Sequence, residues 1–188
     1  MIFSLTTSTL VIAENEPYYI GFAIGTAFEQ LDEEKASNHF LRPTSLDFDN
    51  TYEFQLRAGF IMNKFITGEA ICEYLFPFEA DSAKENVEID VLHLAVQSKL
   101  TFQQSGPLHP YALIGLGLIN SQMEAQIKFD NRSIQETEWG VSTKLGAGVD
   151  IYITPVIFST IELSWTKGLG NVDHIQYPSF ILGGNFRF

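Results

Sequence analysis

The chain has 188 residues and a formal net charge of −12, with 45% hydrophobic, 13% aromatic and 18% charged residues. Its 16 phenylalanines and low charge content exclude an intrinsically disordered chain, which would be poor in aromatics and rich in charge. The acidic balance and the lack of a Lys/Arg cluster argue against binding to nucleic-acid phosphates, and no apolar run approaches the roughly 18 residues of a membrane-spanning helix.

Residues 1–13 are predicted to be a secretory signal peptide. The stretch from Met1 to Ile12 is mostly apolar and hydroxylic, and Val11-Ile12-Ala13 has residues that a signal peptidase tolerates, although no Lys or Arg precedes the apolar stretch. Residues 14–188 are predicted to form one domain, since no repeat of solenoid period and no second region of distinct composition is visible. Cys72 is the sole cysteine, so neither an intrachain disulfide nor a cysteine-based zinc site can form.

From residue 17 onward the pattern of polar and apolar residues has a period of two, which is typical of strands. The seven prolines fall between these runs or at their ends, because proline cannot donate to a central strand ladder. The predicted strands cover 18–29, 51–62, 65–77, 87–102, 110–120, 138–153, 156–167 and 178–188. Their lengths are near or slightly above the roughly 9–11 residues of a tilted membrane-spanning strand.

The connections between these runs alternate in length. Residues 62–64, 103–109 and 153–155 form short connections, whereas 30–50, 78–86, 121–137 and 168–177 are long and polar. An up-and-down antiparallel barrel produces this alternation, with four long loops at one end. The first three loops hold an acidic excess, namely Asp32, Glu33, Glu34, Asp47, Asp49, Glu79, Asp81, Glu85, Glu124, Asp130 and Glu136.

The two faces of each run differ in polarity. In the second run Phe54, Leu56 and Phe60 alternate with Glu53 and Arg57, and in several runs the polar face also carries the glycines. A soluble lipocalin-like barrel binding an apolar ligand would place these glycines in water, where each costs roughly 0.5–1 kcal/mol. In a narrow membrane barrel they leave room in the lumen for long charged side chains. The pattern therefore favours an eight-stranded membrane barrel with the apolar face turned to lipid.

The inward face then collects ten ionisable residues from several strands. They are Glu53, Arg57, Glu69, Glu73, His93, Lys99, Lys144, Asp150, Glu162 and Arg187. An eight-stranded barrel is only about wide enough for its side chains, and buried charges must be paired or hydrated. The sequence therefore predicts an ion-pair network that plugs the lumen rather than a pore.

No catalytic, cofactor or metal site is predicted. Three of the four histidines (His39, His109 and His174) fall in predicted loops or turns, and the fourth, His93, points inward as a network member. Spacing alone places no Ser-His-carboxylate set together, and no carboxylate or histidine cluster has metal-ligand spacing. The enzymatic alternative is a lipid A-modifying barrel with His93 as its general base.

Three stretches resemble the outer-membrane β-barrel family of Gram-negative bacteria, of the small OmpA-like, OmpX-like and opacity-like kind. They are Pro110-Tyr111-Ala112-Leu113-Ile114-Gly115-Leu116-Gly117, Leu145-Gly146-Ala147-Gly148-Val149-Asp150 and Leu182-Gly183-Gly184-Asn185-Phe186-Arg187-Phe188. The resemblance implies a monomer in the outer membrane, in contact with lipid and lipopolysaccharide. It also implies that Phe186 and Phe188 are the signal read by the barrel assembly machinery.

The same resemblance implies a non-enzymatic role in envelope structure, surface interaction or adhesion. No peptidoglycan-binding domain follows Phe188, so the cell-wall tethering of longer relatives is not expected. No cofactor and no nucleic-acid partner are expected.

Overall fold

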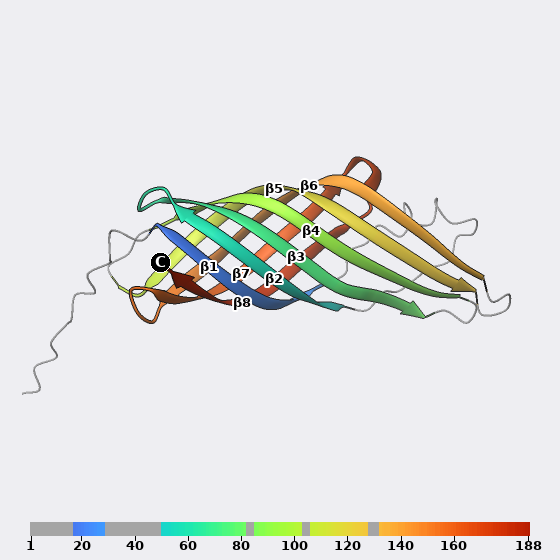
Figure 1. Cartoon of the computed structure of the whole chain (residues 1–188), viewed down its shortest axis with the longest axis horizontal. Coiled ribbons are helices and arrows are strands. Elements are labelled where there is room, and N and C mark those ends of the chain that lie inside the picture. Colours follow the sequence, from blue (N-terminus) through green and yellow to red (C-terminus); the bar gives the residue numbers. More distant parts are fainter. Residues whose placement is uncertain (1–16, 29–49, 82–84, 103–105, 128–131) are drawn as a thin grey trace, which may run out of the picture.

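The computed structural model describes residues 17–28, 50–81, 85–102, 106–127 and 132–188. It is a closed barrel in which every strand pairs antiparallel with the next along the chain and the last pairs with the first, which confirms the predicted fold (Figure 1). The strands are β1 (Tyr18–Ala27), β2 (Thr51–Ile61), β3 (Ile66–Asp81), β4 (Glu85–Thr101), β5 (Leu108–Ile127), β6 (Arg132–Tyr152), β7 (Ile157–Leu169) and β8 (Gln176–Arg187). A 3-10 turn, η1 (Gly170–Val172), precedes β8.

Short turns join the strands at one end of the barrel, which we name the turn end. Between β2 and β3, Asn63 Oδ1 accepts hydrogen bonds from the backbone N–H groups of Phe65 (2.8 Å) and Ile66 (3.0 Å). Between β6 and β7, Thr154 Oγ1 likewise accepts from Ile157 N at 2.9 Å. Asn and Thr side chains that replace backbone acceptors in this way favour tight turns. The opposite end is named the loop end.

The middle strands are longer at the loop end than the sequence predicted. The connections predicted at 78–86 and 121–137 lie largely within paired strands, because β4 and β5 stay in register out to Glu85↔Ile127, and β5 and β6 out to Ile127↔Arg132. These segments are polar at most positions and so resemble loops, although Met123, Ala125 and Ile127 continue the alternation of the preceding strand. The predicted first loop, 30–50, lies outside the described residues except for Asn50.

Pro77 was predicted to mark a strand border, but β3 passes through it. The register between β3 and β4 shifts between Leu75 and Phe78. Over this interval β3 advances by three residues while β4 advances by two. A β-bulge of this kind accommodates a residue that has no N–H to donate.

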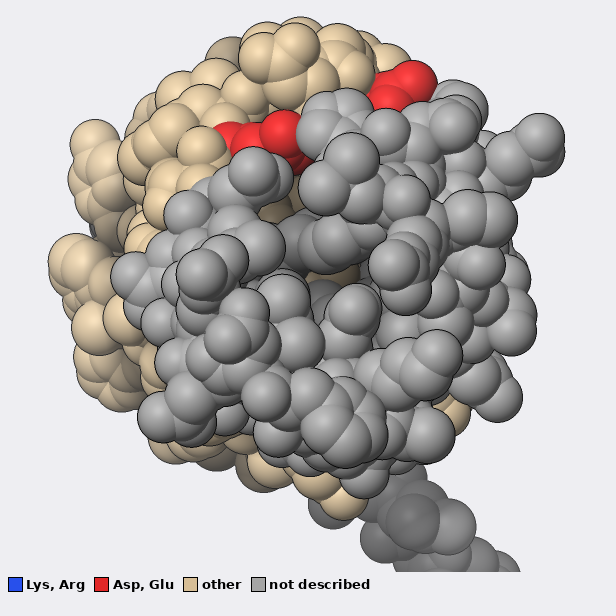
Figure 2. Space-filling view, turned by 90° about the vertical axis from the view of Figure 1, so that its right-hand side faces the viewer, with Lys and Arg blue, Asp and Glu red and all other residues tan. Residues whose placement is uncertain are grey.

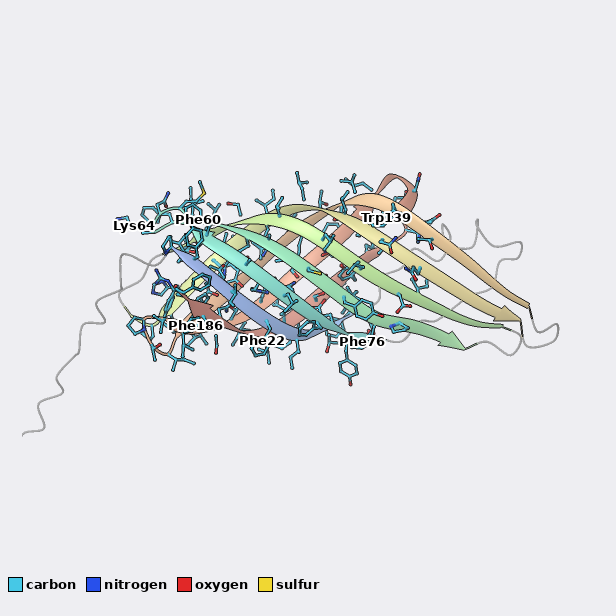
Figure 3. All side chains as sticks on the ribbon, viewed as in Figure 1. Phe22, Phe60, Lys64, Phe76, Trp139 and Phe186 are labelled. Carbon is cyan, nitrogen blue, oxygen red and sulfur yellow. The ribbon has the colours of Figure 1, made fainter. Side chains whose placement is uncertain are left out.

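The barrel is apolar outside and polar inside. Large apolar side chains cover the exterior, as Figure 3 shows for Phe22, Phe60 and Phe186, and Tyr52 and Leu116 are 73% and 60% exposed. Inside the lumen, glycines lie where an aromatic side chain packs against the neighbouring strand. A Cβ on Gly59 would lie 2.1 Å from Tyr19 Cζ, and one on Gly148 would lie 2.5 Å from the Tyr111 hydroxyl. The glycine face is therefore the lumen face, as predicted. A lipocalin-like barrel with an apolar lumen is wrong for this chain.

Candidate functional site

The ten ionisable residues predicted to face inward are all buried in the lumen, and none is more than 6% exposed. They come from β2, β3, β4, β6, β7 and β8. Many of their contacts join strands that are not neighbours in the wall, so the side chains cross the lumen.

Near the turn end the contacts centre on Lys99. Its Nζ lies 2.8 Å from Asp150 Oδ2 and 3.5 Å from Glu69 Oε1, and 3.9 Å above the ring of Tyr111. Asp150 also accepts from Thr160 Oγ1 at 2.7 Å. The Lys99 ammonium group is therefore neutralised by carboxylates from β3 and β6.

In the middle of the barrel the guanidinium group of Arg57 crosses the lumen. Its Nη1 lies 3.5 Å from Glu162 Oε2 on β7, and the Tyr111 hydroxyl donates to the same oxygen at 2.8 Å. The guanidinium also donates to the side-chain oxygen of Gln55, and Gln55 in turn donates to Glu73.

Glu73 is the centre of the contacts in the part of the lumen toward the loop end. Lys144 Nζ lies 2.6 Å from Oε2, Gln55 Nε2 donates to the same atom at 2.7 Å, and the Tyr177 hydroxyl donates to Oε1 at 2.8 Å. His93 Nδ1 lies 3.6 Å from Oε1. One carboxylate thus gathers side chains from β2, β4, β6 and β8, and its charge is balanced by a fully buried lysine.

The structure brings together a Ser-His-carboxylate set that the spacing of residues in the sequence could not place. Ser142 Oγ lies 2.8 Å from His93 Nε2, and Glu73 lies at the other ring nitrogen. Sequence could not place them because the three residues lie on β6, β4 and β3, and spacing does not give the register between strands. All three are at 0% exposure, so a substrate has no access to the hydroxyl.

The chain between β7 and β8 covers this set from the loop end. Val172 is fully buried, and a Cβ on Gly140 would lie 2.1 Å from its Cγ2. A Cβ on Gly168 would lie 2.0 Å from the carbonyl oxygen of Val172, and Gly168 is the register partner of Ser142. Glycine at 140 and 168 therefore lets η1 fold inward over the lumen.

Three lumen tyrosines were missed at the sequence level, namely Tyr19, Tyr111 and Tyr177, which are at most 2% exposed. The predicted lumen network includes only acidic and basic residues and His93. The signal that identifies Tyr19 is its position: it alternates with the outward Tyr18 and Ile20 and shares a face with Gly21 and Ala23. Its hydroxyl donates to Glu69.

The exterior apolar band requires an apolar environment. Soluble monomers rarely expose a contiguous apolar patch of more than a few hundred Å², whereas here exposed Phe, Leu, Ile and Val side chains occur on all eight strands. Trp139 lies toward the loop end of this band (Figure 3), and Tyr18 and Phe188 stack at the turn end with ring centroids 6.5 Å apart. Aromatics at both borders are typical of a bilayer-spanning barrel.

The two residues assigned to the assembly signal lie on this exterior surface. Phe186 is 50% exposed and Phe188 is 53% exposed.

No helix in the described part of the chain is long and apolar enough to cross a membrane.

Comparison with known proteins agrees with this geometry. The sequence model of a family described as outer membrane protein beta-barrel domain matches residues 1–188. No curated protein matches the chain in sequence.

Solved structures with a similar fold include three outer-membrane proteins. Neisserial surface protein A is 10% identical, with a TM-score of 0.60 over 91% of this chain and 96% of that one. The N-terminal barrel domain of Pseudomonas aeruginosa OprF is 18% identical, with a TM-score of 0.54 and coverage of 92% and 98%. The attachment invasion locus protein of Yersinia pestis, Ail, is 18% identical, with a TM-score of 0.54 and coverage of 92% and 97%.

Proposed function

We propose that this chain, which belongs to the outer membrane protein β-barrel family, is a plugged, non-enzymatic barrel of the bacterial outer membrane that acts through its loop end. Its role on this proposal is envelope structure, surface interaction or adhesion. The observation that carries the proposal is the Glu73 hub, where one buried carboxylate holds Lys144, Gln55 and Tyr177 across the lumen. On this proposal the hub blocks the passage of solutes through the lumen.

The orientation follows from the lengths of the connections. Barrels of this kind have short periplasmic turns and longer extracellular loops, so the turn end and Phe188 face the periplasm. Figure 2 shows acidic side chains and no basic ones among the described residues in view at the loop end. The acidic side chains in view suit divalent cations bridging to anionic lipopolysaccharide, or a basic partner.

The remaining partners belong to the same proposal. The barrel contacts outer-membrane lipid through its exterior band and acts as a monomer, and the exposed Phe186 and Phe188 present the C-terminal strand to the assembly machinery. The names of two structurally similar proteins, a surface protein and an attachment invasion protein, support a surface role.

Conductance measurement and cell fractionation test this proposal together. We expect the chain in the outer-membrane fraction, with a gel mobility in cold SDS that shifts on boiling, because a closed ladder has no free edge from which to unravel. In planar bilayers the purified protein should give no stable conductance steps. Regular steps from the heat-shifting, folded form would contradict the plugged lumen, and recovery in the soluble periplasm would contradict the location.

A second candidate function is favoured by the Ser142, His93 and Glu73 geometry, which matches the order of nucleophile, base and orienting carboxylate in acyl-transfer enzymes. An alkyl fluorophosphonate tests it, since an activated serine attacks phosphorus, expels fluoride and passes its proton to the histidine. We expect no labelling of the folded barrel because Ser142 is buried. Labelling that is lost in both Ser142→Ala and His93→Ala, with the heat shift retained, would support the lipid-modifying enzyme instead.

A further inference from the structure

The lumen opens at the turn end into a small cavity, which we name the turn mouth. Its volume is about 110 Å³, and the residues that line it come from all eight strands and from the turn between β2 and β3. The polar residues that matter for its chemistry are Asn63, Lys64, Thr67, Thr101, His109 and Arg187. A cavity of this size holds a few waters or one compact ion, but no sugar or peptide.

The turn mouth is rich in hydrogen-bond donors. Lys64 is exposed at the rim (Figure 3), where its Nζ lies 4.9 Å from the centroid of the Phe65 ring. Asn63 Oδ1 is occupied by two backbone N–H groups, so its side-chain NH₂ is the part left to bind a ligand. The hydroxyls of Thr67 and Thr101 line the same cavity and have no hydrogen-bond partner among the described residues.

Packed aromatic rings border one side of the cavity. Arg187 is 6% exposed and lines the cavity from β8. His109 is held by a 3.1 Å contact between Nε2 and the carbonyl oxygen of Gly106, and by its ring packing 4.7 Å from that of Tyr152. The Tyr152 ring in turn stacks on the Phe158 ring, with centroids 5.0 Å apart. His109, Tyr152 and Phe158 therefore form a continuous aromatic wall of the cavity.

The single acidic side chain lining the turn mouth among the described residues does not offset these donors. Asp150 is paired with Lys99 at 2.8 Å and accepts from Thr160 at 2.7 Å, so its charge is already balanced within the lumen network. The turn mouth is thus lined by Arg187, Lys64, the Asn63 NH₂ and two threonine hydroxyls, beside an aspartate whose charge is balanced within the lumen network.

We propose that the turn mouth binds a phosphate group. Arginine and lysine with hydroxyl and amide donors on several sides match a tetrahedral oxyanion better than a planar carboxylate, since the donors come from strands around the whole barrel axis. The phosphate comes either from free solution or from the headgroup of a neighbouring lipid. The inference depends on the geometry of the mouth and not on the role proposed for the loop end.

Calorimetric titration tests the site on the full chain folded in a phosphate-free maltoside detergent at constant ionic strength. The probes are inorganic phosphate and dihexanoyl phosphatidic acid. We expect saturable one-to-one binding that is weakened at least about tenfold in Lys64→Gln/Thr101→Val, because the loss of even one charge-assisted hydrogen bond weakens binding by about an order of magnitude or more. Both side chains lie at the barrel rim, and the heat shift verifies that the variant is folded.

Lys167→Gln is the matched control, because Lys167 lies toward the loop end, 6.0 Å from the Trp165 ring centroid, and far from the turn mouth. It should bind both probes as the unaltered chain does. If both probes bind and the double variant loses both, the site takes phosphate from either source; if only phosphatidic acid binds with that loss, the source is a lipid headgroup. Absence of binding by both probes, or equal binding by the double variant, overturns the proposal whatever the conductance result.

Discussion

Replacing Lys144 by methionine is expected to lower the free energy of unfolding by about 3–5 kcal/mol, the range for breaking a buried ion pair on one side. Lys144 is 1% exposed and lies 2.6 Å from Glu73 Oε2. Methionine fills much of the same volume but leaves the Glu73 carboxylate buried without its lysine. Urea unfolding in lipid vesicles, followed by the fluorescence of Trp139 and Trp165, measures the loss.

Two further variants separate the missing partner from a general effect of losing a lysine. In Lys144→Met/Glu73→Gln the carboxylate is gone as well, so most of the lost stability should return. Lys167→Met removes a lysine that lies on the outer wall, and it should unfold close to the unaltered chain. If the double variant is no more stable than Lys144→Met, the buried charge is not the cause.

Replacing Leu116 by arginine is expected to lower the free energy of unfolding by about 2–4 kcal/mol, the penalty for an arginine facing lipid near the bilayer midplane. Leu116 is 60% exposed on the outer face of β5. On that face it lies between Leu108 at the turn end and Asn120, whose register partner is Trp139. The same unfolding measurement in vesicles gives the value.

Leu108→Arg is the matched control on the same strand and the same face. Leu108 is 49% exposed at the first position of β5, where a long side chain reaches the polar interface, so the loss should be about 0–1 kcal/mol. Equal losses at the two positions would mean that the apolar face does not sit across a bilayer.

The fold could be predicted because its two main signals are local. In β2, alternate residues from Thr51 to Gly59 are buried and those between them exposed, so parity alone assigned the lumen face. The eight strands, the closed barrel and the polar lumen followed from such parity and from the lengths of the connections. The loop-end extensions of β5 and β6 were missed because their high polar content resembles that of a loop, although Met123, Ala125 and Ile127 keep the period of two in β5.

The contacts within the lumen could not be predicted, because they depend on register and on distances across the barrel. Glu73 and Lys144 are 71 residues apart in sequence, and nothing local to either indicates that they meet. His93 was assigned inward correctly, but its neighbour Ser142 follows only once the registers of β4, β5 and β6 are fixed. Tyr19 and Tyr111 could have been placed in the lumen from the same alternation, but only acidic and basic residues and His93 were assigned to the network.

The seam between β1 and β8 constrains when folding can finish. It pairs Tyr19 with Arg187, and the backbone N–H of Phe188 donates to the carbonyl of Tyr18 at 2.9 Å, so the two ends of the described chain close the wall. Contacts between such distant residues carry a large loop-closure entropy and form slowly. Until the last residues arrive, β1 remains an unpaired edge able to recruit another chain. The chain therefore needs protection from aggregation between its synthesis and the moment its C-terminal strand docks.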